Sequence, residues 1–181
     1  MRLFISLEVP EDIRKNIIIA KDKLGINGKI KWVPIGNIHI TIKFLGGVQD
    51  GLLEDIKAKI RNAAKDTVPF DVSVRGIGTF GRPPRVVWAG IDRGKIQLID
   101  LMKKMDASLS CIRQEDFKPS PHITIGRIRS SEPGSMPLQP FEKEMFGEFV
   151  ADSVHLMEST LSKDGPSYSC METFRFGANE S

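Results

Sequence analysis

Apolar and polar residues alternate along much of this chain, and the alternation predicts most of its secondary structure. Period-two runs occur in residues 2–9, 38–45, 70–75, 85–91 and 121–128, as in strands with one buried face. Two longer runs, residues 149–161 and 168–176, follow near the end of the chain, with a turn expected at 163–166. The pattern therefore predicts a protein built largely of strands.

Helices are predicted between these strands, where apolar residues recur every three or four positions. The spacing predicts helices over residues 11–24, 53–63 and 95–110, with Asp50 as a plausible N-cap of the second. A shorter helix is expected at residues 141–146. Clusters of glycine, proline and serine predict loops at 76–84 and 130–140, and the residues after 176 are expected to fray.

The two halves of the chain repeat the same order of elements. Strand 2–9, helix 11–24 and strand 38–45 match strand 85–91, helix 95–110 and strand 121–128. This order predicts an α+β fold with a single bilobal domain over residues 1–181. We expect two pseudo-symmetric lobes, each with a mostly antiparallel sheet and outer helices, and an active-site cleft between them.

A repeated tetrad carries the strongest chemical signal. His39-Ile40-Thr41-Ile42 recurs as His122-Ile123-Thr124-Ile125, and the chain has only three histidines in total. On a strand, the histidine and threonine of each copy share one face and the isoleucines share the other. If the halves are related by a pseudo-two-fold axis, an imidazole reaches the same substrate atom from each side.

Three interpretations of the paired histidines are open at this stage. In the first, one imidazole takes a proton from water and the other gives one to a leaving oxygen at phosphorus, while threonine hydroxyls bind the phosphoryl oxygens. In the second, the histidines bind a metal, although zinc usually requires three or four protein ligands. In the third, they are structural or only bind an anion. The identical copies favour acid–base chemistry, with no metal.

Counting by twos assigns the residues after each tetrad to a face of the strand. Lys43 falls with His39 and Thr41, whereas Phe44 falls with the isoleucines and is expected to fill the core rather than to contact a base. Arg127 falls on the isoleucine face in the second copy. It reaches the cleft only if the strand bulges or ends near Gly126, and otherwise it faces solvent at the rim.

Other residues are weaker candidates. Phe80 could stack on a nucleobase at the cleft mouth or anchor its glycine- and proline-rich turn. His155 lies outside the repeat and is expected to be a structural histidine with satisfied hydrogen bonds. Trp32 and Trp88 are expected in the core or between the lobes. Basic residues beside loops could follow an RNA backbone: Arg82, Arg85, Lys118 and Arg129.

Composition adds few constraints. A hydrophobic fraction of 40% and a charged fraction of 27% are ordinary for a soluble globular protein, and a net charge of +3 permits an anionic partner. No apolar run reaches the ~18–20 residues that cross a bilayer, and residues 1–10 do not resemble a signal peptide, so a cytoplasmic location is expected. Cys111 and Cys170 lack metal-site spacing and are expected to be free, buried thiols.

These motifs resemble those of the two-histidine phosphoesterases, and most of all the RNA 2′,3′-cyclic phosphodiesterases, also called 2′-5′ RNA ligases. The resemblance extends over nearly the whole chain. It rests on residues 1–5 with 9–10, 31–33, 39–46, 78–81, 87–90, 121–127, 158–159 and 165–168. Paired histidine-threonine tetrads at this separation, with these flanks, make the resemblance specific.

The resemblance implies hydrolysis of RNA 2′,3′-cyclic phosphate ends to 2′-phosphates without a cofactor. It implies that His122 activates water, His39 protonates the departing O3′, and the phosphate is bound by Thr41, Thr124 and Arg127. Phe44 and Phe80 are the candidates for contact with a base or the RNA.

The partner expected from the resemblance is RNA with a cyclic phosphate end, tRNA fragments included, bound by a monomer. By microscopic reversibility, the resemblance also implies weak 2′-5′ ligation at the same site without ATP. The chain lacks GxxxxGK[ST], so an ATP-driven ligase is poorly supported. Two alternatives are an RNA-end binder without turnover and a phosphodiesterase for a small cyclic phosphate such as that of ADP-ribose.

Overall fold

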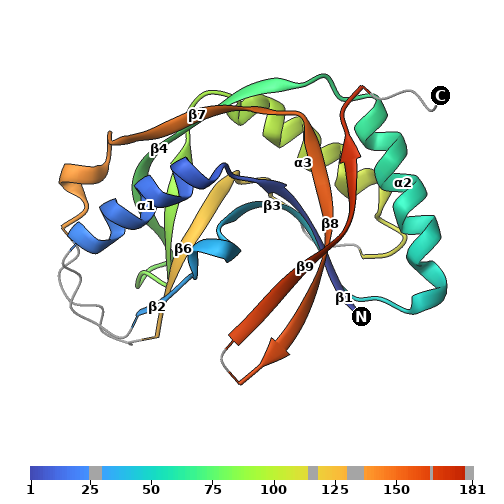
Figure 1. The fold of residues 1–181 in the computed structure, drawn as a ribbon, viewed down its shortest axis with the longest axis horizontal. Helices are drawn as coiled ribbons and strands as arrows, with labels where there is room; N and C mark the ends of the chain where they lie inside the picture. The colour runs from blue at the N-terminus through green and yellow to red at the C-terminus, as the bar shows by residue number, and fades with distance from the viewer. Residues whose placement is uncertain (25–29, 114–117, 130–136, 164, 178–181) are drawn as a thin grey trace.

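A curled, antiparallel sheet forms the centre of the protein. The computed structural model describes residues 1–24, 30–113, 118–129, 137–163 and 165–177. In these residues the strand order is β7-β4-β5-β6-β3-β1-β8-β9, with β2 paired to β6, and every pairing is antiparallel (Figure 1). The mostly antiparallel α+β architecture predicted from the alternation is confirmed.

The bounds of the elements agree with the sequence prediction in the two repeated units. The strands are β1 Arg2–Glu8, β2 Ile30–Trp32, β3 His39–Gly47, β4 Phe70–Phe80, β5 Val86–Ile91, β6 His122–Ile128, β7 Met145–Ala151, β8 Ser153–Ser162 and β9 Gly165–Arg175. The α-helices are α1 Glu11–Lys23, α2 Leu53–Lys65 and α3 Lys95–Ser108, and short 3₁₀ turns are η1 Ile35–Asn37, η2 Asp50–Leu52 and η3 Gln139–Phe141. In the described part of the chain, no helix is both long and apolar enough to span a bilayer.

The sheet consists of two matching halves that meet at β3 and β6. From this junction the order runs β3-β1-β8-β9 in one direction and β6-β5-β4-β7 in the other. Ile40 pairs with Ile123 at the junction, so the two tetrads lie side by side in opposite directions. The two lobes expected from the repeat are therefore halves of one continuous sheet.

Helices α1 and α3 each pack against the half of the sheet that does not contain the strand before them. Helix α1 lies on one side of the sheet's centre, and α2 and α3 lie on the other (Figure 1). The helix α1 follows β1 in sequence but packs against β7, where the Asn16 side chain donates to the Phe146 carbonyl at 2.8 Å. The helix α3 follows β5 but packs against β3 and α2. The buried residues of both halves consequently form one hydrophobic cluster.

Four predictions about where elements begin and end are wrong. The strand β4 continues to Phe80 through the expected loop, because a bulge between Val74 and Ile77 accommodates Gly76 at a φ of 78°. The expected strand 149–161 is two strands, β7 and β8, separated at Asp152, and the expected helix at 141–146 is replaced by η3 and the start of β7. Asp50 begins η2 and does not cap α2, since no side-chain cap is present there.

Other predictions have mixed outcomes. Cys111 and Cys170 are free thiols, but both are exposed rather than buried, because one follows α3 on the surface and the other lies on β9 at the edge of the sheet. Positions 130–136 of the expected loop, position 164 of the expected turn and positions 178–181 of the expected frayed end lie outside the described residues.

A bulge in β3 reverses the faces taken by the residues after the first tetrad. Adjacent residues of β1 pair with Thr41 and Lys43, so Ile42 has no partner of its own in that strand. An extra residue in one strand exchanges the two faces for the side chains that follow it. Lys43 is therefore buried and Phe44 is 52% exposed, the opposite of what counting by twos predicts.

The buried Lys43 joins β3 to α3 through an ion pair. Its ammonium group donates to the Asp106 carboxylate and, at 3.2 Å, to the Arg113 carbonyl oxygen, and its side chain is only 2% exposed. Removing one partner of a buried pair leaves a charge without its counter-ion, which typically costs about 3–5 kcal/mol.

We expect Asp106→Asn to lower the free energy of unfolding by about 2–3 kcal/mol, less than for a fully buried pair because Asp106 is partly exposed to solvent. Urea unfolding followed by circular dichroism measures the loss. Asp100→Asn removes an exposed carboxylate from the same helix and is the matched control. Equal stabilities of the two variants would contradict the structural role of the pair.

Candidate active site

The junction of β3 and β6 gathers the polar residues of both tetrads on one face of the sheet. Ile40 and Ile123 pair across the junction and are fully buried on the other face. The histidine before each isoleucine and the threonine after it project from the opposite face. One cavity of about 580 Å³ is lined by all four side chains, His39, Thr41, His122 and Thr124.

Each imidazole is held by the backbone carbonyl two residues before it. Nδ1 of His39 lies 2.7 Å from the Asn37 carbonyl oxygen, and Nδ1 of His122 lies 2.7 Å from the Ser120 carbonyl oxygen. Because a carbonyl oxygen only accepts, both Nδ1 atoms carry hydrogen and donate. The tautomer of each ring is thereby fixed, and Nε2 is the nitrogen left for chemistry in the cleft.

His39 lies in an aromatic enclosure. Its ring centroid is 5.1 Å from that of Phe4 and 5.6 Å from that of Tyr168, which meets it edge to face. Burial lowers the pKa of His39, the hydrogen bond to the Asn37 carbonyl opposes this, and the proximity of His122 lowers the pKa further. A neutral ring results in which Nε2 accepts a hydrogen bond from the Thr41 hydroxyl at 3.0 Å.

His122 packs against Phe80 on its own side of the cleft. The two rings meet edge to face, with centroids 4.9 Å apart and an interplanar angle of 88°. Phe80 ends β4, is 37% exposed and also lines the cavity that contains both histidines. Phe80 was expected either at the cleft mouth or as an anchor of its turn, and its position agrees with the cleft mouth.

A second bulge brings Arg127 to the cleft. Adjacent residues of β5 pair with Thr124 and Gly126, which leaves Ile125 without a partner there. The bulge near Gly126 that one interpretation of Arg127 required is confirmed, and the exposed Arg127 lines the cavity. Phe44 occupies the same position after the first tetrad and lines the cavity too, so its assignment to the core is wrong.

The remaining cleft residues come from elements that the repeat does not mark. Tyr168 reaches the cleft from β9, where burial raises the pKa of its phenol and the charge of Arg127 opposes that shift. Trp32 covers Gly126, where a Cβ would come within 2.7 Å of the indole. The other lining residues not proposed for the site are Lys31, Val33, Pro34, Asn37, Val86 and Pro166, and Arg129 lies with them.

Several expected candidates lie elsewhere. His155 is on β8, where Nδ1 and the Thr173 hydroxyl are 2.9 Å apart, so it is hydrogen-bonded as a structural histidine should be. Arg82, Arg85 and Lys118 are absent from the lining of the cleft as far as the structure describes it. Among the described residues, no group of three or more histidine, cysteine or acidic side chains could hold a metal ion.

Comparisons with known proteins show which proteins this chain is similar to. A family model described as LigT-like phosphoesterase matches residues 7–88. RNA 2′,3′-cyclic phosphodiesterase from Archaeoglobus fulgidus is 33% identical over 96% of this chain and 99% of the relative. The protein of the same name from Methanocaldococcus jannaschii is 33% identical over 93% of this chain and 96% of its own length.

Solved structures share the fold over nearly the whole chain. The structure of TT0787 from Thermus thermophilus superposes with a TM-score of 0.84 at 28% identity, covering 99% of this chain and 100% of that one. E. coli LigT complexed with 3′-AMP gives a TM-score of 0.83 at 22% identity, with 98% of both chains covered. With full-length relatives that are 33% identical, the chain belongs to the LigT-like phosphoesterase family.

Proposed function

We propose that this protein hydrolyses RNA 2′,3′-cyclic phosphate ends to 2′-phosphates, with His39 and His122 as general acid and general base. The observation that carries the proposal is the single cavity lined by both imidazoles, each with Nδ1 bound to a backbone carbonyl. Relatives named for this activity, about 30% identical over their full length, support the choice of substrate.

In the proposed reaction, Nε2 of His122 takes a proton from a water molecule as the water oxygen bonds to phosphorus. The P–O3′ bond breaks on the opposite side, and Nε2–H of His39 gives its proton to O3′. The phosphate stays attached to O2′, so the product is a 2′-phosphomonoester with a free 3′-hydroxyl. Exchange of one proton with solvent at each ring returns the starting state, and no metal takes part in this chemistry.

The threonines and the arginine bind the phosphoryl oxygens in this proposal. The Thr41 and Thr124 hydroxyls donate to the non-bridging oxygens, on which negative charge increases in the transition state. Arg127 adds a cation at the same cleft. Phe44 and Tyr168 offer ring faces and edges to the terminal nucleoside, as aromatic residues do for unpaired RNA bases.

The acid role of His39 requires a proton on an imidazole whose pKa is lowered by burial. The negative charge of a cyclic phosphate between the rings favours the imidazolium and so raises the pKa when substrate binds. Nε2 then becomes a donor, and the Thr41 hydroxyl, which now donates to Nε2 at 3.0 Å, turns to the phosphate. Binding and activation of the acid are coupled in this way.

The test is an RNA oligonucleotide ending in a 2′,3′-cyclic phosphate, incubated with the protein in the presence of EDTA. We expect complete conversion to the 2′-phosphate, identified by chromatography against both monophosphate standards, at a rate that EDTA does not change. Recovery of the 3′-phosphate would show that O2′, and not O3′, is the leaving group. Saturable, salt-sensitive binding without turnover would instead support the RNA-end binder, and faster turnover of an ADP-ribose cyclic phosphate would support the small-nucleotide alternative.

A further inference from the structure

The end of the β8–β9 hairpin projects from the body of the sheet and carries Tyr168 to the catalytic cleft (Figure 1). The pairing of β1 with β8 ends at Glu158, and in the described part of the chain the next residues of β8 pair only with β9. A two-stranded ribbon without a third strand is at best marginally stable by itself. The position of Tyr168 therefore depends on contacts between the hairpin and the rest of the protein.

The side chain of Asn37 makes such a contact. Its Nδ2 donates a hydrogen bond to the Pro166 carbonyl oxygen at 2.9 Å, across 129 positions of the chain. Pro166 lies two residues before Tyr168, and all three residues line the catalytic cleft. The bond thus joins the projecting hairpin to the 3₁₀ turn η1, which directly precedes the strand of the first tetrad.

The same residue holds His39 through its backbone. The Asn37 carbonyl oxygen accepts from Nδ1 of His39 at 2.7 Å. Tyr168 meets the imidazole edge to face, with centroids 5.6 Å apart, and its ring also contacts that of Phe4 at 4.9 Å. The torsion that turns an imidazole about its Cβ–Cγ bond has broad minima, so neighbouring groups set the plane of the ring. Asn37 therefore orients His39 twice, directly through its carbonyl and indirectly through Tyr168.

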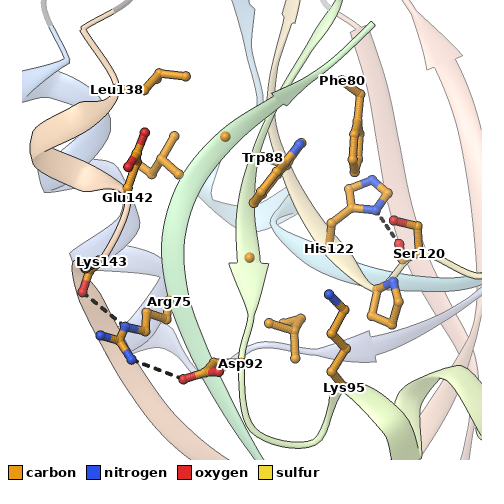
Figure 2. A pocket seen from close by; sticks show the side chains of 15 residues that line it. Arg75, Phe80, Trp88, Asp92, Lys95, Ser120, His122, Leu138, Glu142 and Lys143 are labelled. Carbon is orange, nitrogen blue, oxygen red and sulfur yellow. Dashed lines mark hydrogen bonds and ion pairs between the residues drawn. The ribbon is translucent and has the colours of Figure 1, made fainter.

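His122 is supported differently. Figure 2 shows its hydrogen bond to Ser120, which takes the place of Asn37 in the second copy of the repeat. Among the described residues, the Ser120 hydroxyl has no hydrogen-bond partner. The ring against His122 is that of Phe80, which is paired to Val86 within the sheet and needs no further anchor (Figure 2). A side-chain link to a distant segment is thus found at His39 and not at His122.

We infer that Asn37 is a positioning residue, whose side chain holds the hairpin so that Tyr168 keeps the His39 ring aimed at the leaving oxygen. The inference rests on the proposed function, in which His39 gives its proton to O3′. A general acid has to lie within hydrogen-bond reach of the atom that it protonates, and a misplacement of about 1 Å can cost about 10²-fold in rate. Release of the hairpin should therefore slow the protonation of O3′, which is a loss in kcat.

The test compares two substrates that differ in their need for an acid. The O3′ of an RNA 2′,3′-cyclic phosphate leaves with a proton, whereas the nitrophenolate of a nitrophenyl phosphodiester leaves without one. The variant is Asn37→Ala, which keeps the backbone carbonyl that binds His39. We expect kcat on the RNA to fall by roughly tenfold, as for one lost hydrogen bond, and kcat on the nitrophenyl ester by less than about twofold. General damage to the fold would lower both equally.

Asn16→Ala is the matched control. The Asn16 amide also donates to a distant carbonyl oxygen, that of Phe146 at 2.8 Å, but this bond joins α1 to β7 outside the catalytic cleft. Its loss should leave kcat on both substrates unchanged. A double-mutant cycle adds a second readout. On the RNA, Asn37→Ala should add little to the loss in Tyr168→Leu, because the ring that Asn37 holds in place is already absent.

Two results would overturn the positioning role of Asn37. One is that Asn37→Ala changes kcat on the two substrates by the same factor, an unchanged kcat on both included. The other is full additivity of the losses in Asn37→Ala and Tyr168→Leu. The proposed function fails on different observations: no hydrolysis of the RNA cyclic phosphate by the unaltered protein, or a loss of equal size on both substrates in His39→Ala.

Discussion

Replacing either His39 or His122 with alanine is expected to lower kcat on an RNA 2′,3′-cyclic phosphate by about 10²–10⁴-fold. Each substitution removes one of the two proton transfers at phosphorus while leaving the sheet junction in place, because the paired and buried residues there are isoleucines. His155→Ala is the matched control, since the third histidine lies on β8 outside the cleft. Unchanged turnover in either cleft variant would contradict general acid–base catalysis by these two histidines.

The pH dependence separates the two roles. His39 has to be protonated to act as the acid, so in His122→Ala the rate should fall as pH rises through the pKa of His39, which burial lowers from its usual value. In His39→Ala the acid is absent, so this fall of the rate should disappear. The measurement is kcat/KM over pH for both variants; a fall that persists in His39→Ala would mean that His39 is not the acid.

A second substrate checks the same assignment without relying on pH. A nitrophenyl phosphodiester loses nitrophenolate, which leaves without being protonated, so the acid is dispensable. His39→Ala should therefore keep much of its activity on this substrate, while His122→Ala should not. The reverse pattern would identify His39 as the base.

Replacing Thr41 or Thr124 with valine is expected to lower kcat by about 10²–10³-fold, with a smaller change in KM. Valine has nearly the shape of threonine but has no hydroxyl to donate to the phosphoryl oxygens. The substitution should affect kcat more than KM, because the negative charge on these oxygens grows in the transition state. Steady-state kinetics on the cyclic phosphate measure both constants.

The controls for the threonine variants test the hydroxyl itself. Serine at either position should restore most of kcat, since it returns the donor without the methyl group. Thr160→Val changes an exposed threonine on β8 and should have no effect. A rise in KM at constant kcat would mean that the threonines bind substrate and transition state equally well.

The sequence was sufficient to find the elements of the repeat and the meeting of its tetrads. Alternation locates β3 and β6 because each has one buried face, and the repeated tetrad predicts that both histidines share a cleft. The pairing of Ile40 with Ile123 is the physical basis, since it turns the polar faces of the two strands the same way.

What could not be predicted depends on pairing between distant segments. A bulge is defined by the partner strand, so the residues of β3 alone give no sign that Ile42 is skipped and that Phe44 therefore faces the cleft. Tyr168 reaches His39 from β9, and no periodicity connects these positions. Asn37 and Ser120 hold the imidazoles through backbone carbonyls, which every residue type has.

The two bulges give the cleft a polarity that the tetrads lack. The tetrads are identical, so taken alone they would accept a phosphodiester in either direction with equal affinity. Directly beyond the bulges the repeat diverges, with a benzyl group from Phe44 at one end and a guanidinium from Arg127 at the other. A ligand with a flat base on one side and an anion on the other can therefore bind in two orientations that differ in energy. The duplicated fold thus favours one orientation of its ligand.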